Sequence, residues 1–229
     1  MRIDLHIHTQ GSDGIGRPSE IAEAAVRAGL EGIAITDHHR TRTKAGEQVA
    51  EACRARGLLV VRGAEYSAAE GHVLVFGVAM EDLAFGFYAP MQTVIQRAWE
   101  AGGVAIPAHP YHGYRSCLGS GLAALSGLVA VETFNGQVET RSPEENWMAR
   151  VAAQAMGLPG VGGSDAHFPL AVGRCFTHFQ GQFLDARQVV AALRGGQGFL
   201  ACARVLDKSA ILKQNKRYGR AILSKKKAS

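Results

Sequence analysis

Short apolar runs alternate with amphipathic stretches along most of the chain, and polar residues follow directly after the apolar runs. The first run, Ile3 to His8, has apolar residues at every second position, which is typical of a β-strand. His6 and His8 are therefore expected on the same side of the strand, about 6–7 Å apart. Such a pair can bind one divalent ion, and an edge strand with two solvated histidines is the alternative interpretation.

The same pattern predicts six further strands, at residues 32–36, 58–61, 72–76, 104–106, 128–131 and 160–164. Helices are predicted between most of them, at residues 18–28, 44–56, 91–101 and 143–156, with a looser helical piece over 116–126 and a last helix, capped by Asp185, through Leu193. Pro18 and Pro143 mark first turns, and Ser142 with Glu145 has the form of a capping box. Strands and helices that alternate about seven times predict a mostly parallel α/β sheet with helices outside.

Candidate ligands follow strands one, two, three, five and seven, where parallel barrels place their active sites. An open doubly wound sheet would gather ligands from only a few neighbouring strands. We therefore expect a closed or nearly closed barrel, formed by one domain over residues 1–207.

Composition narrows the class of protein. The chain has 229 residues, of which 47% are hydrophobic, and this is enough for one sizeable core. No apolar run reaches the length of about 18 residues that spans a bilayer, and no signal peptide is apparent at the start. The cysteines are far apart and indicate reduced thiols in a cytoplasmic protein: Cys53, Cys117, Cys175 and Cys202.

The charge is unevenly distributed. Residues 208–229 contain eight Lys or Arg and no acid, which leaves 25 − 8 = 17 basic against 20 acidic residues before them. We expect either an amphipathic helix that binds nucleic acid or a disordered solubilising end. The sequence does not indicate a membrane partner or an oligomeric state.

Nine histidine and carboxylate side chains form the candidate site. They are His6, His8, Asp13, His38, Glu65, His72, His109, Asp165 and His167. Nitrogen and carboxylate ligands without thiolate suit zinc, manganese or iron(II). Nine ligands shared among three ions would leave coordination positions open for water and substrate, as in catalytic sites. An Asx turn at Asp13 and a surface histidine at His72 are the alternative interpretations.

These residues lie in motifs that resemble the PHP (polymerase and histidinol phosphatase) domain. The motifs occur in the family's order over about the first 200 residues: Asp4 to Thr9 with Ser12 to Gly14, Ile35 to His38, Gly63 to Glu65 with His72 to Val75, Pro107 to Pro110, and Gly163 to His167. The resemblance implies a distorted (β/α)7 barrel with a trinuclear metal centre. It also implies that the nine candidate positions are all filled.

The resemblance further implies a role for each ligand. His6, His8, Glu65 and Asp165 would hold a first ion. Glu65 would bridge to a second ion at His72 and His109, and a third would lie at Asp13, His38 and His167. Glu65, Asp165 and His167 would form the catalytic group with a metal-bound hydroxide. Similar proteins of this size hydrolyse phosphate esters.

Residues beside the motifs are candidates for substrate binding: Arg17, Arg40, His112, Arg115, Glu132 and Asn135. His112 is a candidate proton donor to a leaving group, and a solvated loop histidine is the alternative. Glu132 and Asn135 would either contact substrate or hold the metal-binding histidines in place. We expect a metal-dependent phosphoesterase acting on a nucleotide or a small phosphorylated metabolite. A nuclease acting on oligonucleotide ends and a non-catalytic metal-binding scaffold are the alternatives.

Overall fold

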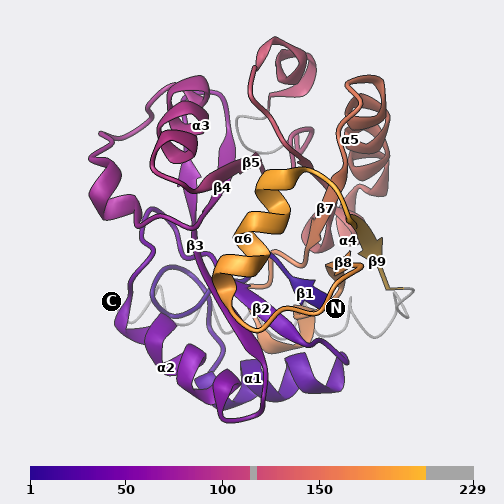
Figure 1. Cartoon of the computed structure of the whole chain (residues 1–229). Coiled ribbons are helices and arrows are strands. Elements are labelled where there is room, and N and C mark those ends of the chain that lie inside the picture. The colour runs from indigo at the N-terminus through magenta and orange to yellow at the C-terminus, as the bar shows by residue number, and fades with distance from the viewer. Residues whose placement is uncertain (114–117, 205–229) are drawn as a thin grey trace, which may run out of the picture.

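The computed structural model describes residues 1–113 and 118–204 and shows an α/β fold (Figure 1). Its strands are β1 (Arg2–Asp4), β2 (Gly32–Ile35), β3 (Leu59–Ser67), β4 (His72–Phe76), β5 (Val104–Pro107), β6 (Val131–Asn135), β7 (Gly160–Gly163), β8 (Cys175–Phe179) and β9 (Phe199–Ala203). Its α-helices are α1 (Pro18–Arg27), α2 (Lys44–Arg54), α3 (Met91–Glu100), α4 (Gly136–Arg141), α5 (Pro143–Ala155) and α6 (Ala186–Gly195). The 3₁₀ turns are η1 (Met80–Leu83), η2 (Gly119–Ala124) and η3 (Pro169–Ala171). Arg115, Cys117 and the basic tail at 208–229 lie outside the described residues.

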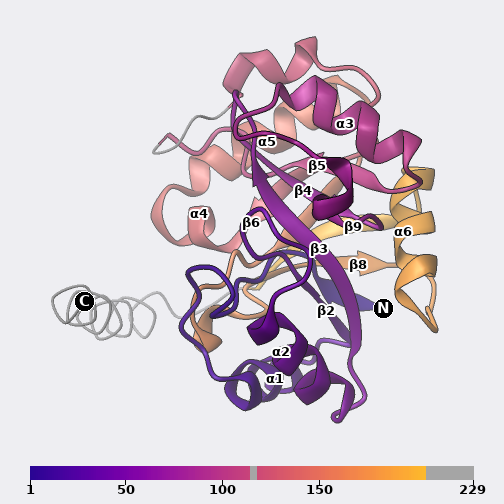
Figure 2. The ribbon, with the colours of Figure 1, turned by 90° about the vertical axis from the view of Figure 1, so that its left-hand side faces the viewer.

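Seven strands form one curled sheet in the order β5-β4-β3-β2-β1-β8-β9, and β6 and β7 form a separate pair. The pair packs against β8 and β9. Helices α1 and α2 lie together at one end of the molecule, whereas α3 and α5 lie at the other (Figure 1, Figure 2). The described strands therefore form a half barrel with an added pair, and their hydrogen bonds do not close a complete (β/α)7 ring.

The prediction of a mostly parallel sheet is wrong. Among the described strands, only β1–β2, β2–β3 and β6–β7 are parallel, whereas β3–β4, β4–β5, β1–β8 and β8–β9 are antiparallel. Only residues 68–71 separate β3 from β4, and so short a connection permits only antiparallel pairing. Strands β8 and β9, which we did not predict, extend the sheet beyond β1.

His72 differs from most of the other candidate ligands because it begins its apolar run instead of following it. The direction of its strand explains this difference. Because β4 runs antiparallel to β3, His72 pairs with Ser67 and lies at the edge where β3 ends. Strand β5 reverses direction again, so Pro107 pairs with Val73 and the chain reaches His109 at the same edge. One edge of the sheet thus collects ligands from strand starts and strand ends alike.

The sixth strand begins three residues later than predicted, at Val131 instead of Leu128. Glu132 and Asn135 therefore lie within β6, and both are completely buried. Helix α4 follows directly at Gly136 and was not predicted. The predicted helical piece at 116–126 is represented among the described residues by the turn η2.

The core lies inside the curled sheet and beneath the helices. Its largest completely buried side chains include Ile3, Leu5, Leu74, Phe76 and Phe179. Cys53, Cys175 and Cys202 form no disulfide with one another in the described part of the chain. Within residues 1–113 and 118–204, none of the helices has the length and apolarity needed to cross a membrane.

Candidate metal centre

The structure brings all nine predicted ligand residues together at the edge of the sheet. Segments that follow β1, β2, β5 and β7 carry His6, His8, His38, His109, Asp165 and His167, whereas β3 and β4 carry Glu65 and His72. Asp13 lies in the loop between β1 and α1. The approach is close enough to require glycine at the end of β7, because a Cβ on Gly163 would lie 2.3 Å from the His6 Cβ.

Glu65 lies at the centre of the cluster, and its two carboxylate oxygens face different groups of histidines. Its Oε1 is 2.8 Å from His72 Nδ1 and 3.0 Å from His109 Nε2. Its Oε2 is 3.2 Å from His8 Nε2 and 3.4 Å from His6 Nε2. One carboxylate thus connects two sets of possible metal ligands.

Asp165 completes the set around Glu65 Oε2. Its Oδ1 lies 3.3 Å from His8 Nε2 and 3.6 Å from His6 Nε2. The backbone of Asp165 has a φ of 52°, and that of His109 has a φ of 28°, values that non-glycine residues rarely adopt. Strained backbone at two of the candidate ligands indicates that their placement serves the site.

A third group of donors lies nearer to solvent. Asp13 Oδ2 is 3.1 Å from His167 Nε2 and 3.6 Å from His38 Nε2. The side chains of Asp13, His38 and His167 are 46%, 21% and 23% exposed, whereas those of His6 and His8 are completely buried. His8 Nδ1 lies 3.5 Å from Asp13 Oδ1 and connects this group to the first.

Several of these atoms lack the partners that a protein without metal should give them. His6 Nε2 and His8 Nε2 are 3.2 Å apart, and they form a hydrogen bond only if one of them carries a proton. His38 Nδ1 is buried without a hydrogen bond to any residue in 1–113 or 118–204, although Glu65 Oε2 lies 3.3 Å away. Buried polar atoms are normally paired, so converging lone pairs fit divalent cations as the missing partners.

The charges of the cluster shift its pKa values strongly. Burial lowers the pKa of His6, but the carboxylates of Asp165 and Glu132 outweigh burial and raise that pKa well above its ordinary value. Burial is likewise outweighed at His8, where hydrogen bonds to Asp165 and Glu65 raise the pKa to about 9. Burial raises the pKa of Glu65, but the charge of His6 outweighs it and holds that pKa well below its usual range.

Metal affinity should therefore rise with pH. Below pH 9 the His8 side chain of the metal-free protein is an imidazolium with a proton on both ring nitrogens. A metal ion must displace one of these protons, because only neutral imidazole is a ligand. We expect the affinity for Mn²⁺ to increase about tenfold per pH unit for each proton displaced between pH 6 and pH 8. Calorimetric titration in two buffers of different ionisation enthalpy measures both the affinity and the proton release. An affinity that is equal at pH 6 and pH 8 would contradict the expectation.

Glu132 positions two of the candidate ligands. Its Oε1 lies 3.0 Å from His6 Nδ1, and its Oε2 accepts a 2.8 Å hydrogen bond from the backbone N–H of His109. A proton on His6 Nδ1 leaves Nε2 free to bind metal, which is the usual arrangement behind a metal-binding histidine. Asn135 donates to Glu132 Oε2 at 3.0 Å and to Asp165 Oδ2 at 3.3 Å.

The structure corrects the assignment of Glu132 and Asn135 to substrate binding. Both side chains are completely buried beneath the ligands, so neither can reach a substrate at the surface of the cluster. Of the two roles considered for them, holding the metal-binding residues in place is the one that the geometry fits. They determine the tautomer of His6 and the orientation of Asp165.

We expect Glu132→Gln to weaken metal binding about tenfold to a hundredfold, because an amide cannot stabilise the proton on His6 Nδ1 as a carboxylate does. Metal titration followed by isothermal calorimetry measures the change. Glu144→Gln is the matched control, since Glu144 is exposed at the start of α5. Equal metal affinity in the two variants would show that Glu132 does not position the ligands.

Sequence reasoning missed three buried or half-buried side chains that hold the ligand loops. Asp37 accepts hydrogen bonds from Thr9 and Ser12, and thereby fixes the loop that leads to Asp13. Asp4 accepts from the backbone of Ser164, next to Asp165. Both Asp4 and Asp37 lie inside the PHP-like motifs, and this position is the sequence feature that could have identified them as residues of the site.

The third missed residue is Gln137 in α4. Its amide lies 2.9 Å from His167 Nδ1, and it also donates to the carbonyl of Asp165 at 3.1 Å. His167 Nδ1 lies 3.0 Å from the same carbonyl. Because an amide nitrogen only donates, His167 Nδ1 accepts from Gln137 when the ring proton is on Nε2 and faces Asp13. Metal binding through Nε2 requires the proton on Nδ1, where it donates to the Asp165 carbonyl that Gln137 also holds. No sequence pattern pointed to Gln137, because α4 itself was not predicted.

The remaining substrate candidates lie around the cluster. Arg17 and Arg40 are exposed in loops beside the ligands, and their role in binding stays a prediction. His112 stacks edge-on against His109, with ring centroids 5.6 Å apart. The Glu145 carboxylate binds His112 Nδ1 at 2.9 Å and the Gly113 N–H at 3.2 Å. Glu145 thus supports the site, and the predicted side-chain cap from Ser142 is not formed.

Comparison with known proteins agrees with the motifs. An uncharacterized protein of Methanocaldococcus jannaschii, MJ1587, is 35% identical over 147 residues, which cover 59% of this chain and 82% of that protein. The PHP-associated family PHP_C matches residues 143–197. The chain belongs to the PHP domain family. The prediction of family membership is therefore confirmed.

Solved structures show the same fold. A two-domain protein from Bacteroides vulgatus, which contains a predicted PHP-like metal-dependent phosphoesterase, aligns with a TM-score of 0.68 at 19% identity. The alignment covers 89% of this chain, which spans 65% of the length of that protein. The lesion-specific endonuclease EndoQ from Pyrococcus furiosus aligns with a TM-score of 0.60 at 16% identity, over 87% of this chain and 57% of the endonuclease.

Proposed function

We propose that this PHP protein is a metal-dependent phosphatase that hydrolyses a phosphate monoester of a nucleotide or a similar small metabolite. The placement of the two Glu65 oxygens carries the proposal, because one faces His72 and His109 and the other faces the deepest histidines. Carboxylate bridging of this kind holds two ions about 3.5–4 Å apart, the separation used for in-line displacement at phosphorus.

Three divalent ions, of zinc, manganese or iron, fit the donor groups. His6, His8, Glu65 and Asp165 would hold the first; Glu65, His72 and His109 the second; and Asp13, His38 and His167 the third. When bound, such ions activate water and neutralise charge on a phosphoryl group. Glu132 keeps Nε2 of His6 directed at the centre, and Gln137 holds the Asp165 carbonyl that would accept the Nδ1 proton of a metal-bound His167.

The solvent-facing side of the cluster is where we expect the substrate. Asp13, His38 and His167 are partly exposed there, and Arg17 and Arg40 lie in the adjoining loops. His112 lies beside His109, with Nδ1 held by Glu145. Its Nε2 can therefore donate a proton to the oxygen of a departing alcohol.

The test is phosphate release by the full-length chain loaded with Mn²⁺ or Zn²⁺. A generic aryl phosphate and a panel of nucleotides and sugar phosphates are the substrates, and His8→Ala is the control. We expect metal-dependent turnover that the control lacks. Metal binding that raises the melting temperature without turnover of any phosphate ester would reject the proposal in favour of a metal-binding scaffold.

A nuclease is the second candidate, favoured by the structural likeness to the Pyrococcus endonuclease. On this proposal the basic residues of 208–229 would anchor the phosphates of an oligonucleotide. Deleting these residues should then weaken oligonucleotide binding, and binding by the full chain should fall steeply with salt. Binding that ignores both the deletion and the salt would remove this candidate.

A further inference from the structure

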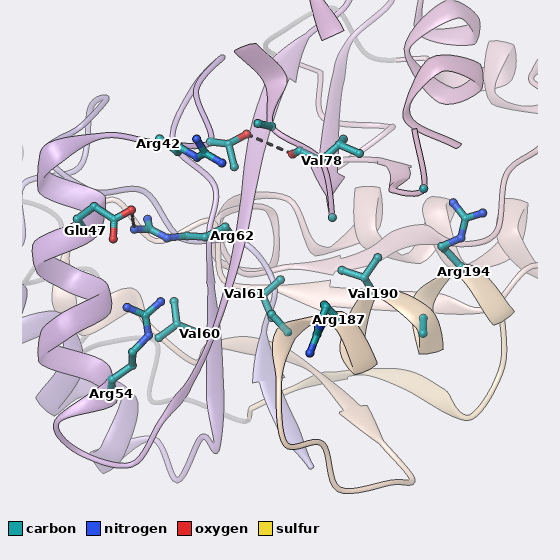
Figure 3. A pocket seen from close by; sticks show the side chains of 16 residues that line it. Arg42, Glu47, Arg54, Val60, Val61, Arg62, Val78, Arg187, Val190 and Arg194 are labelled. Carbon is teal, nitrogen blue, oxygen red and sulfur yellow. Dashed lines mark hydrogen bonds and ion pairs between the residues drawn. The ribbon is translucent and has the colours of Figure 1, made fainter. Parts of the chain in front are cut away.

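A cavity of about 480 Å³ opens between α2, β3 and α6 (Figure 3). None of the nine candidate metal ligands lines it. Strand β3 lies between α2 and α6 and forms the floor that connects the two sides of the cavity. A volume of this size lies within the range of small-molecule sites.

Among the described residues that line this cavity, five are arginines and Glu47 is the only acid. Figure 3 shows Arg42, Arg62 and Arg54 along the α2 side and Arg187 and Arg194 along the α6 side. The chain before residue 208 has a net charge of 17 − 20 = −3, so this concentration of positive charge is local. Guanidinium groups that share one cavity repel each other unless an anion lies among them.

Three of the five guanidinium groups have no ion pair with a described residue, whereas Arg187 pairs with Asp185 and Arg62 with Glu47. Arg62 forms an ion pair with Glu47, yet its buried Nε and Nη1 have no hydrogen-bond partner among the residues that the structure describes. Arg194 stacks on the Trp99 ring at 3.7 Å and donates to backbone carbonyls, which carry no compensating charge. Arg42 and Arg54 are exposed at the cavity, and their side chains have no ion pair with any described residue.

The wall between the two rows of arginines is apolar. Val60 and Val61 of β3 and Val190 of α6 lie there, between the α2 side and the α6 side (Figure 3). Ala186 and Ala191 extend this surface along α6. The cavity therefore combines a surface for an apolar or planar group with cations that match phosphate.

We propose that this cavity is a second ligand site, which binds a small phosphorylated molecule with a planar apolar portion, such as a nucleoside diphosphate. The phosphates would lie among Arg42, Arg54 and Arg62, where bidentate hydrogen bonds are available, and the planar group would pack on the valines. A strand of nucleic acid fits less well, because the arginines flank two sides of one cavity instead of forming a continuous stripe.

Calorimetric titration of the full-length chain with ADP tests this proposal. Each cavity variant is prepared twice, once alone and once combined with His8→Ala. Binding of ADP that disappears in the proteins with His8→Ala is assigned to the metal centre. We expect saturable binding of ADP in both series, and at least about tenfold weaker binding of adenosine or pyrophosphate alone. The double variant Arg42→Ala/Arg54→Ala should bind ADP at least about tenfold more weakly.

Two controls separate contact from general electrostatic attraction. Lys44→Ala removes one charge from α2 at an exposed position that does not line the cavity, and it should leave ADP affinity nearly unchanged. Ala191→Phe fills the cavity without changing charge and should abolish binding. The proposal would be overturned by any of three results: no saturable binding of ADP, a loss of ADP affinity in Lys44→Ala as large as that in Arg42→Ala/Arg54→Ala, or ADP binding that survives Ala191→Phe. An oligonucleotide that binds with the same arginine dependence, while ADP does not, would assign the surface to nucleic acid instead.

Discussion

Glu65→Gln is expected to lower kcat/KM for phosphate ester hydrolysis by about a thousandfold or more, the largest effect that we expect from any single substitution. The carboxylate offers Oε1 to His72 and His109 and Oε2 to the deeper histidines. A neutral amide has one oxygen and an NH₂ group that cannot bind metal, so it cannot connect the two groups of ligands. Steady-state kinetics measures the loss, and elemental analysis measures the metal content.

The metal content distinguishes this explanation from simple unfolding. Glu65→Gln should retain its fold and lose at least one bound ion per chain, whereas Glu51→Gln, an exposed change on α2, should keep the metal content and activity of the wild type. A Glu65→Gln protein with full metal content and wild-type kcat/KM would refute the bridging role. The outcome does not depend on the arginine-lined cavity, since Glu65 does not line it.

The second large effect is expected from His112→Ala, and it should depend on the leaving group. Glu145 holds His112 Nδ1 beside the ligand His109, which places the imidazole to protonate a departing alcohol. For an alkyl or sugar phosphate, whose leaving group needs a proton, we expect kcat to fall about a hundredfold. For an aryl phosphate with a stable phenolate leaving group, the decrease should be less than about threefold.

The ratio of the two effects is the decisive measurement, because a general loss of structure would lower both rates equally. Glu145→Gln should show a weaker version of the same selectivity, since Glu145 acts only by orienting His112. His178→Ala removes an exposed histidine on β8 and should change neither rate. Equal losses on both substrates in His112→Ala would assign the residue to binding or packing instead of proton transfer.

Local patterns predicted the helices well, and strand pairing much less well. The helices α1, α2, α3 and α6 begin within one residue of where the apolar spacing and the prolines or caps placed them. Asp185, for example, caps α6 through a 3.0 Å hydrogen bond from the Gln188 N–H. Amphipathic spacing and helix caps involve residues within one or two helical turns of each other, so the sequence alone can predict them. Strand direction and the pairing of β8 with β1 depend on segments far apart, which no local pattern encodes.

The side chains that meet at the candidate site could be named from sequence, because histidine and carboxylate residues recur in short motifs beside apolar runs. The residues that orient these donor side chains were either not predicted, like Gln137, or predicted with two alternative roles, like Glu132. Gln137 and Glu132 act across 30 and 126 residues of chain, on His167 and His6 respectively. Their roles exist only where the fold brings those segments together.

The sequence by itself thus determined the chemistry of this protein: which donor atoms it has, that these suit divalent cations, and to which family it belongs. The tertiary structure alone decided that the two Glu65 oxygens face separate groups, that the antiparallel β4 returns His72 to the site, and that five arginines share one cavity. The physical reason is one of range. Donor chemistry is a property of each side chain, whereas distance, burial and field at an atom are set by residues that meet only after folding.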